Sequence, residues 1–179
     1  MIEYWVSVGI LVLVVLGTSI SLIYCAITGI SPVPSSRQAR KVMLDAFPAD
    51  TIGTIYELGA GWGALAFPLA LKFPKCEVIA YELSPLPWLY MLIRARLCIR
   101  PNLTIRRGNI QLLPLDDAVA VCMYLYSQGV EKLKPRLEAE LAPGTLVISN
   151  TFEVPGWHPK EVHQLDDTMC PQILVYQTL

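Results

Sequence analysis

Five residues in the first half of the chain have the types and spacing of a nucleotide-binding site. Gly59, Gly61 and Gly63 alternate in the run TIYELGAGWG, Glu57 precedes them, and Glu82 ends the next apolar run. Glycine accepts positive φ angles and lets a ligand approach the backbone closely, and the free N–H groups of a following helix add a partly positive lining. An acid at the end of the next strand, about 20 residues on, can accept both hydroxyls of a ribose. These five residues therefore predict the binding site of a cofactor that contains adenosine.

Glu57 helps to separate the cofactor classes that fit this pattern. The run GAGWGA also matches the looser dinucleotide pattern through Ala64, so an NAD-dependent oxidoreductase is an alternative. A buried carboxylate needs a cationic or N–H partner, whereas a pyrophosphate beside Glu57 would be repelled. Roughly 115 residues follow the motif, which is short for a dinucleotide fold plus a substrate domain. A third hypothesis is a non-catalytic, membrane-tethered protein that keeps the fold for cofactor binding or as a scaffold.

The segments around these residues alternate between strand and helix patterns, which is typical of an α/β domain. Beyond the strand that opens the glycine run, strands are expected at residues 76–82, 103–107, 118–125 and 145–152, and helices at residues 37–47, 64–71, 84–97 and 128–141. The fully apolar run 118–125 suits a central parallel strand that is covered on both faces. We therefore expect a Rossmann-like, doubly wound, mostly parallel sheet.

The order of these motifs resembles the class I, seven-strand S-adenosylmethionine-dependent methyltransferases. The pattern E-x-G-x-G-x-G over residues 57–63 resembles their motif I, and Glu82 resembles the acid that follows it. Asn109 lies in a segment similar to the motif that contacts adenine, and its amide has both a donor and an acceptor. The resemblance covers most of residues 35–179. It implies S-adenosylmethionine as the cofactor, Asn109 as a further cofactor-binding residue, and a C-terminal antiparallel hairpin at residues 162–165 and 173–178.

Three features together are similar to the membrane-anchored lysine methyltransferases within that superfamily. They are an apolar N-terminal segment, the stretch Pro34-Ser35-Ser36 before a helix, and the run VPGW at residues 154–157. That group favours Asp after the second glycine, where this chain has Trp62. The similarity implies a protein-lysine N-methyltransferase that acts on a membrane-proximal acceptor, either a membrane-associated protein or a lipid-soluble molecule.

Three aromatic residues are candidates for the mouth through which the acceptor enters. Tyr124 and Tyr126 lie at the end of the expected strand 118–125, and Trp157 follows the last parallel strand. Ligands bind outside the carboxyl ends of strands in open α/β sheets. A lysine acceptor must be neutral to react, and an apolar aromatic mouth lowers its pKa by desolvation. The alternative is that the tyrosines only close the core.

The N-terminal segment carries no charge between Tyr4 and Ser36. Its apolar part, residues 5–30, exceeds the roughly 20 residues that cross a hydrocarbon core, so it is expected to be a transmembrane helix. Basic residues at 37, 40 and 41 follow it, which places the N-terminus outside and the catalytic domain in the cytosol, at a bacterial inner membrane. The expected organisation is a membrane helix at residues 1–30, a Pro/Ser linker at 31–36 and a methyltransferase-like domain at 37–179.

Composition argues against several other functions. The formal net charge is −1, and from residue 37 onward the acidic and basic residues balance, so no global charge favours nucleic acid. The two histidines and five cysteines show no metal-ligand spacing, so no metal is expected. One basic cluster stands out, which is either a solvated face or a patch for lipid or an acidic substrate: Arg94, Arg96, Arg100, Arg106 and Arg107.

Overall fold

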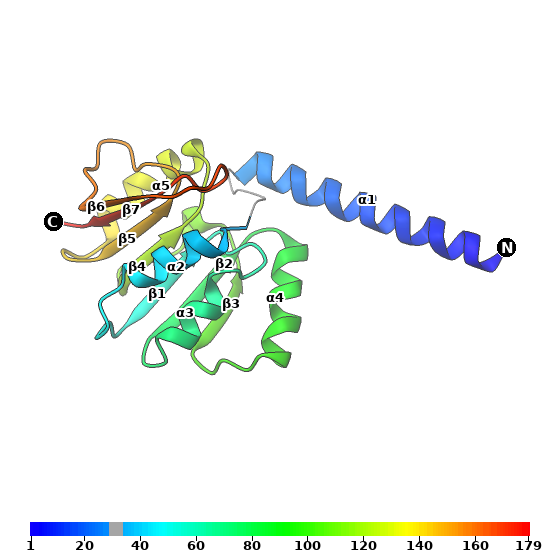
Figure 1. The fold of residues 1–179 in the computed structure, drawn as a ribbon, viewed down its shortest axis with the longest axis horizontal. Helices are drawn as coiled ribbons and strands as arrows, with labels where there is room; N and C mark the ends of the chain where they lie inside the picture. Colours follow the sequence, from blue (N-terminus) through cyan, green and yellow to red (C-terminus); the bar gives the residue numbers. More distant parts are fainter. Residues whose placement is uncertain (29–33) are drawn as a thin grey trace.

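Seven strands form one sheet, and the glycine run leaves from one of its inner strands (Figure 1). The structure, a computed structural model, describes residues 1–28 and 34–179. The strand order is β3-β2-β1-β4-β5-β7-β6. The strands are β1 (Thr54–Leu58), β2 (Glu77–Glu82), β3 (Leu103–Arg107), β4 (Ala118–Met123), β5 (Leu146–Asn150), β6 (Glu161–Gln164) and β7 (Gln172–Gln177).

The first five strands are parallel and the last two form an antiparallel hairpin. β1 pairs with β2 on one side and with β4 on the other, both in parallel register. β7 runs antiparallel to β5 and to β6. The predicted mostly parallel sheet with a C-terminal antiparallel hairpin is therefore confirmed. The strand order reverses between β1 and β4, and ligands bind at the carboxyl ends of strands beside such a reversal.

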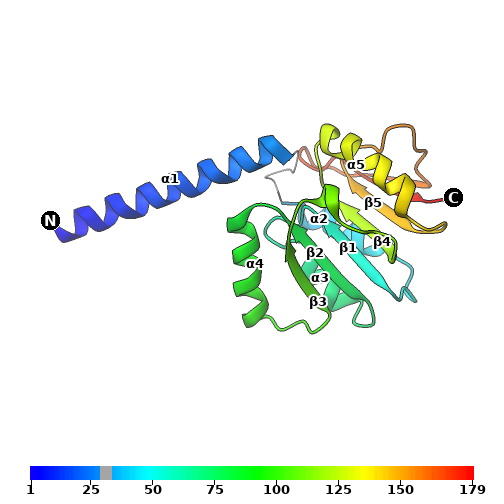
Figure 2. The same cartoon turned by 180° about the vertical axis from the view of Figure 1, so that it is seen from behind.

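Helices cover both faces of this sheet, as the doubly wound prediction requires (Figures 1 and 2). α2 (Arg37–Asp45), α3 (Ala66–Lys72) and α4 (Pro85–Leu97) lie on one face, and α5 (Ser127–Glu140) lies on the other. A 3₁₀ turn, η1 (Ile110–Leu112), joins β3 to β4. Local chemistry sets two of the helix starts. Ser36 accepts a hydrogen bond from Ala39 N (3.1 Å) as the N-cap of α2, and Pro85 occupies the first turn of α4.

Alternate residues of the strands contribute to the apolar clusters on the two faces of the sheet. Leu58 packs with Leu133 of α5 on one face. Ile55 packs with Met43 of α2 and Leu69 of α3 on the other face. Because successive side chains of a strand point to opposite faces, Glu57 points to the same face as Ile55, where α3 begins. The alternation of core residues along β1 therefore directs Glu57, one of the predicted site residues, toward the start of α3.

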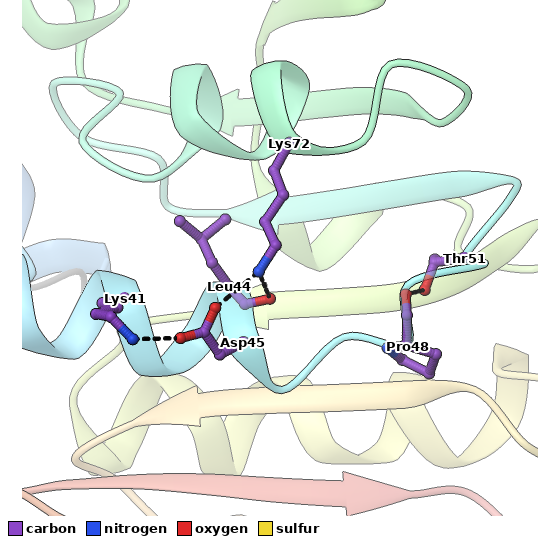
Figure 3. A network of polar contacts seen from close by, with 6 residues as sticks. All are labelled: Lys41, Leu44, Asp45, Pro48, Thr51 and Lys72. Carbon is purple, nitrogen blue, oxygen red and sulfur yellow. Dashed lines mark hydrogen bonds and ion pairs between the residues drawn. The ribbon is translucent and has the colours of Figure 1, made fainter.

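A polar network fixes α2 against α3 (Figure 3). Lys72 of α3 donates to the carbonyl of Leu44 (3.0 Å) and to Asp45 Oδ1 (2.8 Å), at the end of α2. Lys41 pairs with the other oxygen of Asp45 at 2.7 Å. The two lysines lower the pKa of Asp45 to about 2. These groups are exposed, so the network orients α2 more than it stabilises the domain.

The apolar N-terminal segment forms helix α1 (Ile2–Thr28), which projects from the sheet domain (Figures 1 and 2). Among residues 1–28 and 34–179, however, no helix combines the length and the apolar character needed to cross a membrane. The predicted transmembrane helix over residues 5–30 is therefore not supported. No proline interrupts this segment, so beyond the first turn the backbone N–H groups can bond within the helix. Residues 29–33, which complete the predicted span and begin the predicted linker, lie outside the described residues.

Candidate cofactor and acceptor site

The glycine run turns directly over the end of β2. The N–H groups of Gly59 and Ala60 both donate to the carbonyl of Tyr81, at 3.0 and 2.8 Å. All three glycines of the run have positive φ: 78° at Gly59, 54° at Gly61 and 72° at Gly63. This turn delays the start of α3 to Ala66, two residues later than predicted.

Gly61 and Gly63 serve different purposes in the turn. A Cβ atom on Gly63 would lie 2.9 Å from Phe67 Cε2 and 3.0 Å from Met91 Cγ, so that position is closed by packing. A Cβ atom on Gly61 would meet nothing within 4 Å. The turn therefore packs against α3 and α4 through Gly63 and leaves open space at Gly61, where a ligand can approach the backbone.

Glu82 is 1 % exposed and links the glycine run to the start of α4. Its Oε2 accepts the N–H of Gly61 and its Oε1 accepts the N–H of Ser84, both at 2.7 Å. Each carboxylate oxygen can accept two hydrogen bonds. One acceptor site on each oxygen therefore remains for a pair of ribose hydroxyls, and the backbone already holds the carboxylate in place.

Glu57 is also buried, at 7 % exposure, but its environment is different. Its Oε2 has no hydrogen-bond partner among the described residues, whereas the N–H of Ala66 donates to the carboxyl group. Burial, and then the negative charge of Glu82, raise the pKa of Glu57 to about 8. The residue thus presents an unpaired buried oxygen that fits a cationic or N–H group of a ligand.

Asn109 lies close to Glu82 along the backbone, because the N–H of the preceding Gly108 bonds to the carbonyl of Glu82 at 3.3 Å. The side chain of Asn109 caps η1, with Oδ1 accepting the N–H of Gln111 at 3.0 Å. The carbonyl oxygen is therefore used in the cap. The exposed amide NH₂ is the part of Asn109 that can donate to an adenine nitrogen.

Two of the three predicted mouth residues come together past the ends of β4 and β5. Tyr124 stacks on Phe152 with ring centroids 6.2 Å apart, and Tyr126 meets the same ring edge-on at 5.7 Å. The hydroxyl of Tyr124 donates to the carbonyl of Met169 at 2.5 Å, in the loop between β6 and β7. These three rings form the aromatic cluster of the site.

Trp157 lies elsewhere. Its indole N–H donates to Glu138 of α5 (3.0 Å), and its ring packs edge-on against Tyr176 at 5.8 Å. Tyr176 pairs with Val147, near the start of β5 rather than at its carboxyl end. Trp157 lines a cavity of about 520 Å³ between α5 and the C-terminal strand. The structure therefore separates Trp157 from the aromatic cluster.

Two residues near the site were not predicted from the sequence to belong to it. Arg94 reaches from α4 to the carbonyl of Gly63 (3.3 Å), with its guanidinium 4.0 Å from the ring centroid of Phe67. Thr151 takes a φ of 69° directly after β5, and its N–H bonds to the carbonyl of Gln172. A left-handed residue other than glycine stores strain, which is often found at functional sites.

Neither residue has a type that reveals its role, because both roles depend on packing between segments far apart in the sequence. The described residues contain no group of three or more His, Cys, Asp or Glu that could hold a metal ion.

Comparisons with known proteins agree with this geometry. A family model for the ANTKMT methyltransferase domain matches residues 57–161. The chain is 31 % identical over 141 residues to a protein-lysine N-methyltransferase of Saccharolobus islandicus, covering 75 % of this chain and 84 % of that protein. It is 29 % identical over 116 residues to the mouse adenine nucleotide translocase lysine N-methyltransferase, covering 62 % of this chain and 48 % of that protein.

A solved structure supports the fold. The RNA methyltransferase of Salinibacter ruber, in complex with S-adenosyl-L-homocysteine, superposes with a TM-score of 0.73 at 24 % identity, covering 81 % of this chain and 93 % of that one. The oxidoreductase alternative is not favoured by any of these likenesses. The chain belongs to the ANTKMT methyltransferase domain family and is an S-adenosylmethionine-dependent methyltransferase.

Proposed function

We propose that this protein is a protein-lysine N-methyltransferase. Two relatives with that activity in their names support the proposal. The observation that carries it is the aromatic cluster of Tyr124, Tyr126 and Phe152 at the carboxyl edge of the sheet. This edge also holds the two buried acids of the cofactor site, so an acceptor entering between the rings would reach the cofactor.

Four of this chain's groups would hold the cofactor in this proposal. Glu82 accepts the ribose hydroxyls, and Asn109 donates to the adenine. The free oxygen of Glu57 receives the ammonium group of the methionine part, and the open backbone at Gly61 lets the cofactor lie against the turn. S-adenosylmethionine supplies a methyl group on a positively charged sulfur. The protein's task is then to hold methyl and acceptor in line, which lowers the barrier without a nucleophilic side chain of the enzyme.

A lysine acceptor must also lose its proton. From a free pKa near 10.4, deprotonation at pH 7 costs roughly 4–5 kcal/mol. Desolvation between aromatic rings disfavours the ammonium form and lowers this cost. Tyr126 is partly exposed and Phe152 is half-buried, so the cluster is open to an entering side chain. We assign Tyr126 and Phe152 to this step.

Methyl-tritiated S-adenosylmethionine tests the proposal directly. The full chain is incubated with membrane and soluble protein fractions, the labelled proteins are hydrolysed, and the methylated amino acids are separated. The proposal expects methyllysine with wild type and none with Glu82→Gln. Label found only in another amino acid, or only in RNA, would overturn it.

The cellular location remains a proposal from the sequence. It puts the catalytic domain, residues 37–179, on the cytosolic side of a membrane, with a membrane-associated acceptor. Label concentrated in the membrane fraction of the same assay would support that location, and label confined to soluble proteins would contradict it.

A further inference from the structure

Helix α4 carries an apolar stripe on its outer side. Leu89, Tyr90, Ile93 and Leu97 are 46–81 % exposed. Their spacing of three and four residues places them on one face of the helix. A surface helix normally exposes polar side chains to water, so this exposed apolar stripe indicates a binding surface.

Near the N-terminal end of α4, the stripe contacts two neighbouring segments, the glycine run and α1. Tyr90 meets Trp62 of the glycine run edge-on at 5.4 Å, and Trp62 is itself exposed. Leu86, one turn before Tyr90, lies against α1, since a Cβ atom on Gly17 would be 3.4 Å from Leu86 Cδ1. We call Trp62, Leu86, Leu89, Tyr90, Ile93 and Leu97 the α4 apolar face. It is continuous with an exposed apolar helix on one side and with the cofactor loop on the other.

The charged residues in the sequence around the α4 apolar face are all basic. Residues 83–115 contain five arginines and neither aspartate nor glutamate. By helical position, Arg96 flanks the stripe on one side, while Arg94 on the other side is held against Gly63 and Phe67. Arg107 also lies beside α4, with its guanidinium 5.9 Å from the ring of Trp88. An apolar stripe bordered by cations complements a surface that is anionic outside and apolar beneath.

We propose that the α4 apolar face lies on an anionic lipid surface. The aliphatic side chains of the α4 apolar face favour a lipid surface over RNA as its partner. Single-stranded nucleic acid is held by aromatic stacking and phosphate contacts, which leave Leu89, Ile93 and Leu97 without a role. In a bilayer these side chains enter the boundary between headgroups and acyl chains, to a depth of about 5–10 Å. Arg96 then meets the lipid phosphates, and Trp62 brings the cofactor loop to the surface. This inference goes beyond methyl transfer and does not depend on the identity of the acceptor.

Cys98 offers a probe at the end of the stripe. It is exposed and directly follows α4, whereas Cys76, Cys122 and Cys170 are buried. The full chain with Cys25→Ser is labelled at Cys98 with an environment-sensitive fluorophore. It is then mixed with vesicles of phosphatidylcholine alone or with added phosphatidylglycerol. We expect a blue shift and a rise in fluorescence with the anionic vesicles.

Variants separate the α4 apolar face from other contacts. Ile93→Glu with Leu97→Glu should abolish the rise, while Leu71→Glu, an exposed apolar position on α3, should leave it unchanged. Calorimetric binding of S-adenosylmethionine confirms that each variant is folded. As a second variant, Arg96→Glu should remove the preference for anionic vesicles.

Two results would overturn the inference. One is an equal fluorescence rise in wild type and in the double variant, which would assign lipid binding to another part of the chain. The other is a rise in Cys98-label fluorescence with transfer RNA and no rise with vesicles.

Discussion

Glu57 and Glu82 are neighbouring buried acids with different surroundings. Glu82 receives two backbone N–H groups, whereas one oxygen of Glu57 has no partner among the described residues. The burial that raises the pKa of Glu57 to about 8 therefore has a measurable consequence. Between about pH 4.5 and pH 8 the folded protein keeps a proton on Glu57 that the unfolded chain has released.

Stability of the cofactor-free protein should fall as pH rises through that window, because the folded state binds more protons there. Glu57→Gln cannot ionise, so it should remove this decline and raise the melting temperature at pH 8. The gain in unfolding free energy is on the order of a few kcal/mol. Thermal denaturation of both proteins from pH 5 to pH 8.5 checks it. Parallel curves for wild type and variant would show that Glu57 is ionised in the folded protein.

Gly63 gives a second prediction at the scale of single residues. An alanine there meets both a φ of 72° and close contacts with Phe67 and Met91. Left-handed strain costs about 1–2 kcal/mol and overpacking about 1–3 kcal/mol more. Gly144→Ala is the matched control, since its φ is 88° but nothing lies within 4 Å of the added Cβ. Urea denaturation should rank Gly63→Ala well below Gly144→Ala in stability; equal losses would contradict the packing role.

At the scale of elements, the segments that follow β4 and β5 carry the aromatic cluster. Tyr126→Ala opens the cluster and leaves the cofactor acids untouched. We expect kcat/KM for a lysine-containing acceptor to fall by about tenfold or more, with an unchanged Kd for S-adenosylmethionine. Steady-state kinetics and calorimetry separate the two effects.

Trp157→Phe is the control for this prediction, because Trp157 contacts Glu138 and Tyr176 away from the cluster. It should leave kcat/KM and the cofactor Kd close to those of wild type. Loss of cofactor binding in Tyr126→Ala would show instead that this ring supports the fold of the cofactor site.

For the molecule as a whole, the alternation of strand and helix patterns predicted the five parallel strands, and the resemblance to seven-strand methyltransferases predicted the C-terminal hairpin. β3 was predicted at the residues where it lies, and the other strands differ by a few residues at their ends. The acids and glycines of the cofactor site were recognisable because their types are unusual at strand ends. Their mutual contact, Gly61 to Glu82, follows once β1 and β2 pair in parallel.

Other features depend on contacts that no local pattern reveals. Trp157 was predicted at the acceptor mouth from its place after β5, but it packs against Tyr176 and donates a hydrogen bond to Glu138 of α5. Arg94 reads as one charge of a basic cluster, although it binds the glycine turn. The positive φ of Thr151 accompanies a hydrogen bond from its N–H to the carbonyl of Gln172, at the start of β7. The long apolar run at the N-terminus predicted a helix correctly, whereas its membrane-spanning role is not supported.

Cofactor titration of the full chain tests the account most directly. Calorimetry with S-adenosylmethionine, S-adenosylhomocysteine and NAD is run on wild type, on Glu82→Ala, and on Glu77→Ala as an exposed control in the same strand. We predict binding of the first two ligands but not of NAD. Glu82→Ala should weaken binding by at least about tenfold, the value of one lost charge-assisted hydrogen bond, and Glu77→Ala should not. Binding of NAD, or equal affinity in wild type and Glu82→Ala, would contradict the assignment of the carboxyl edge of β1 and β2 as the cofactor site.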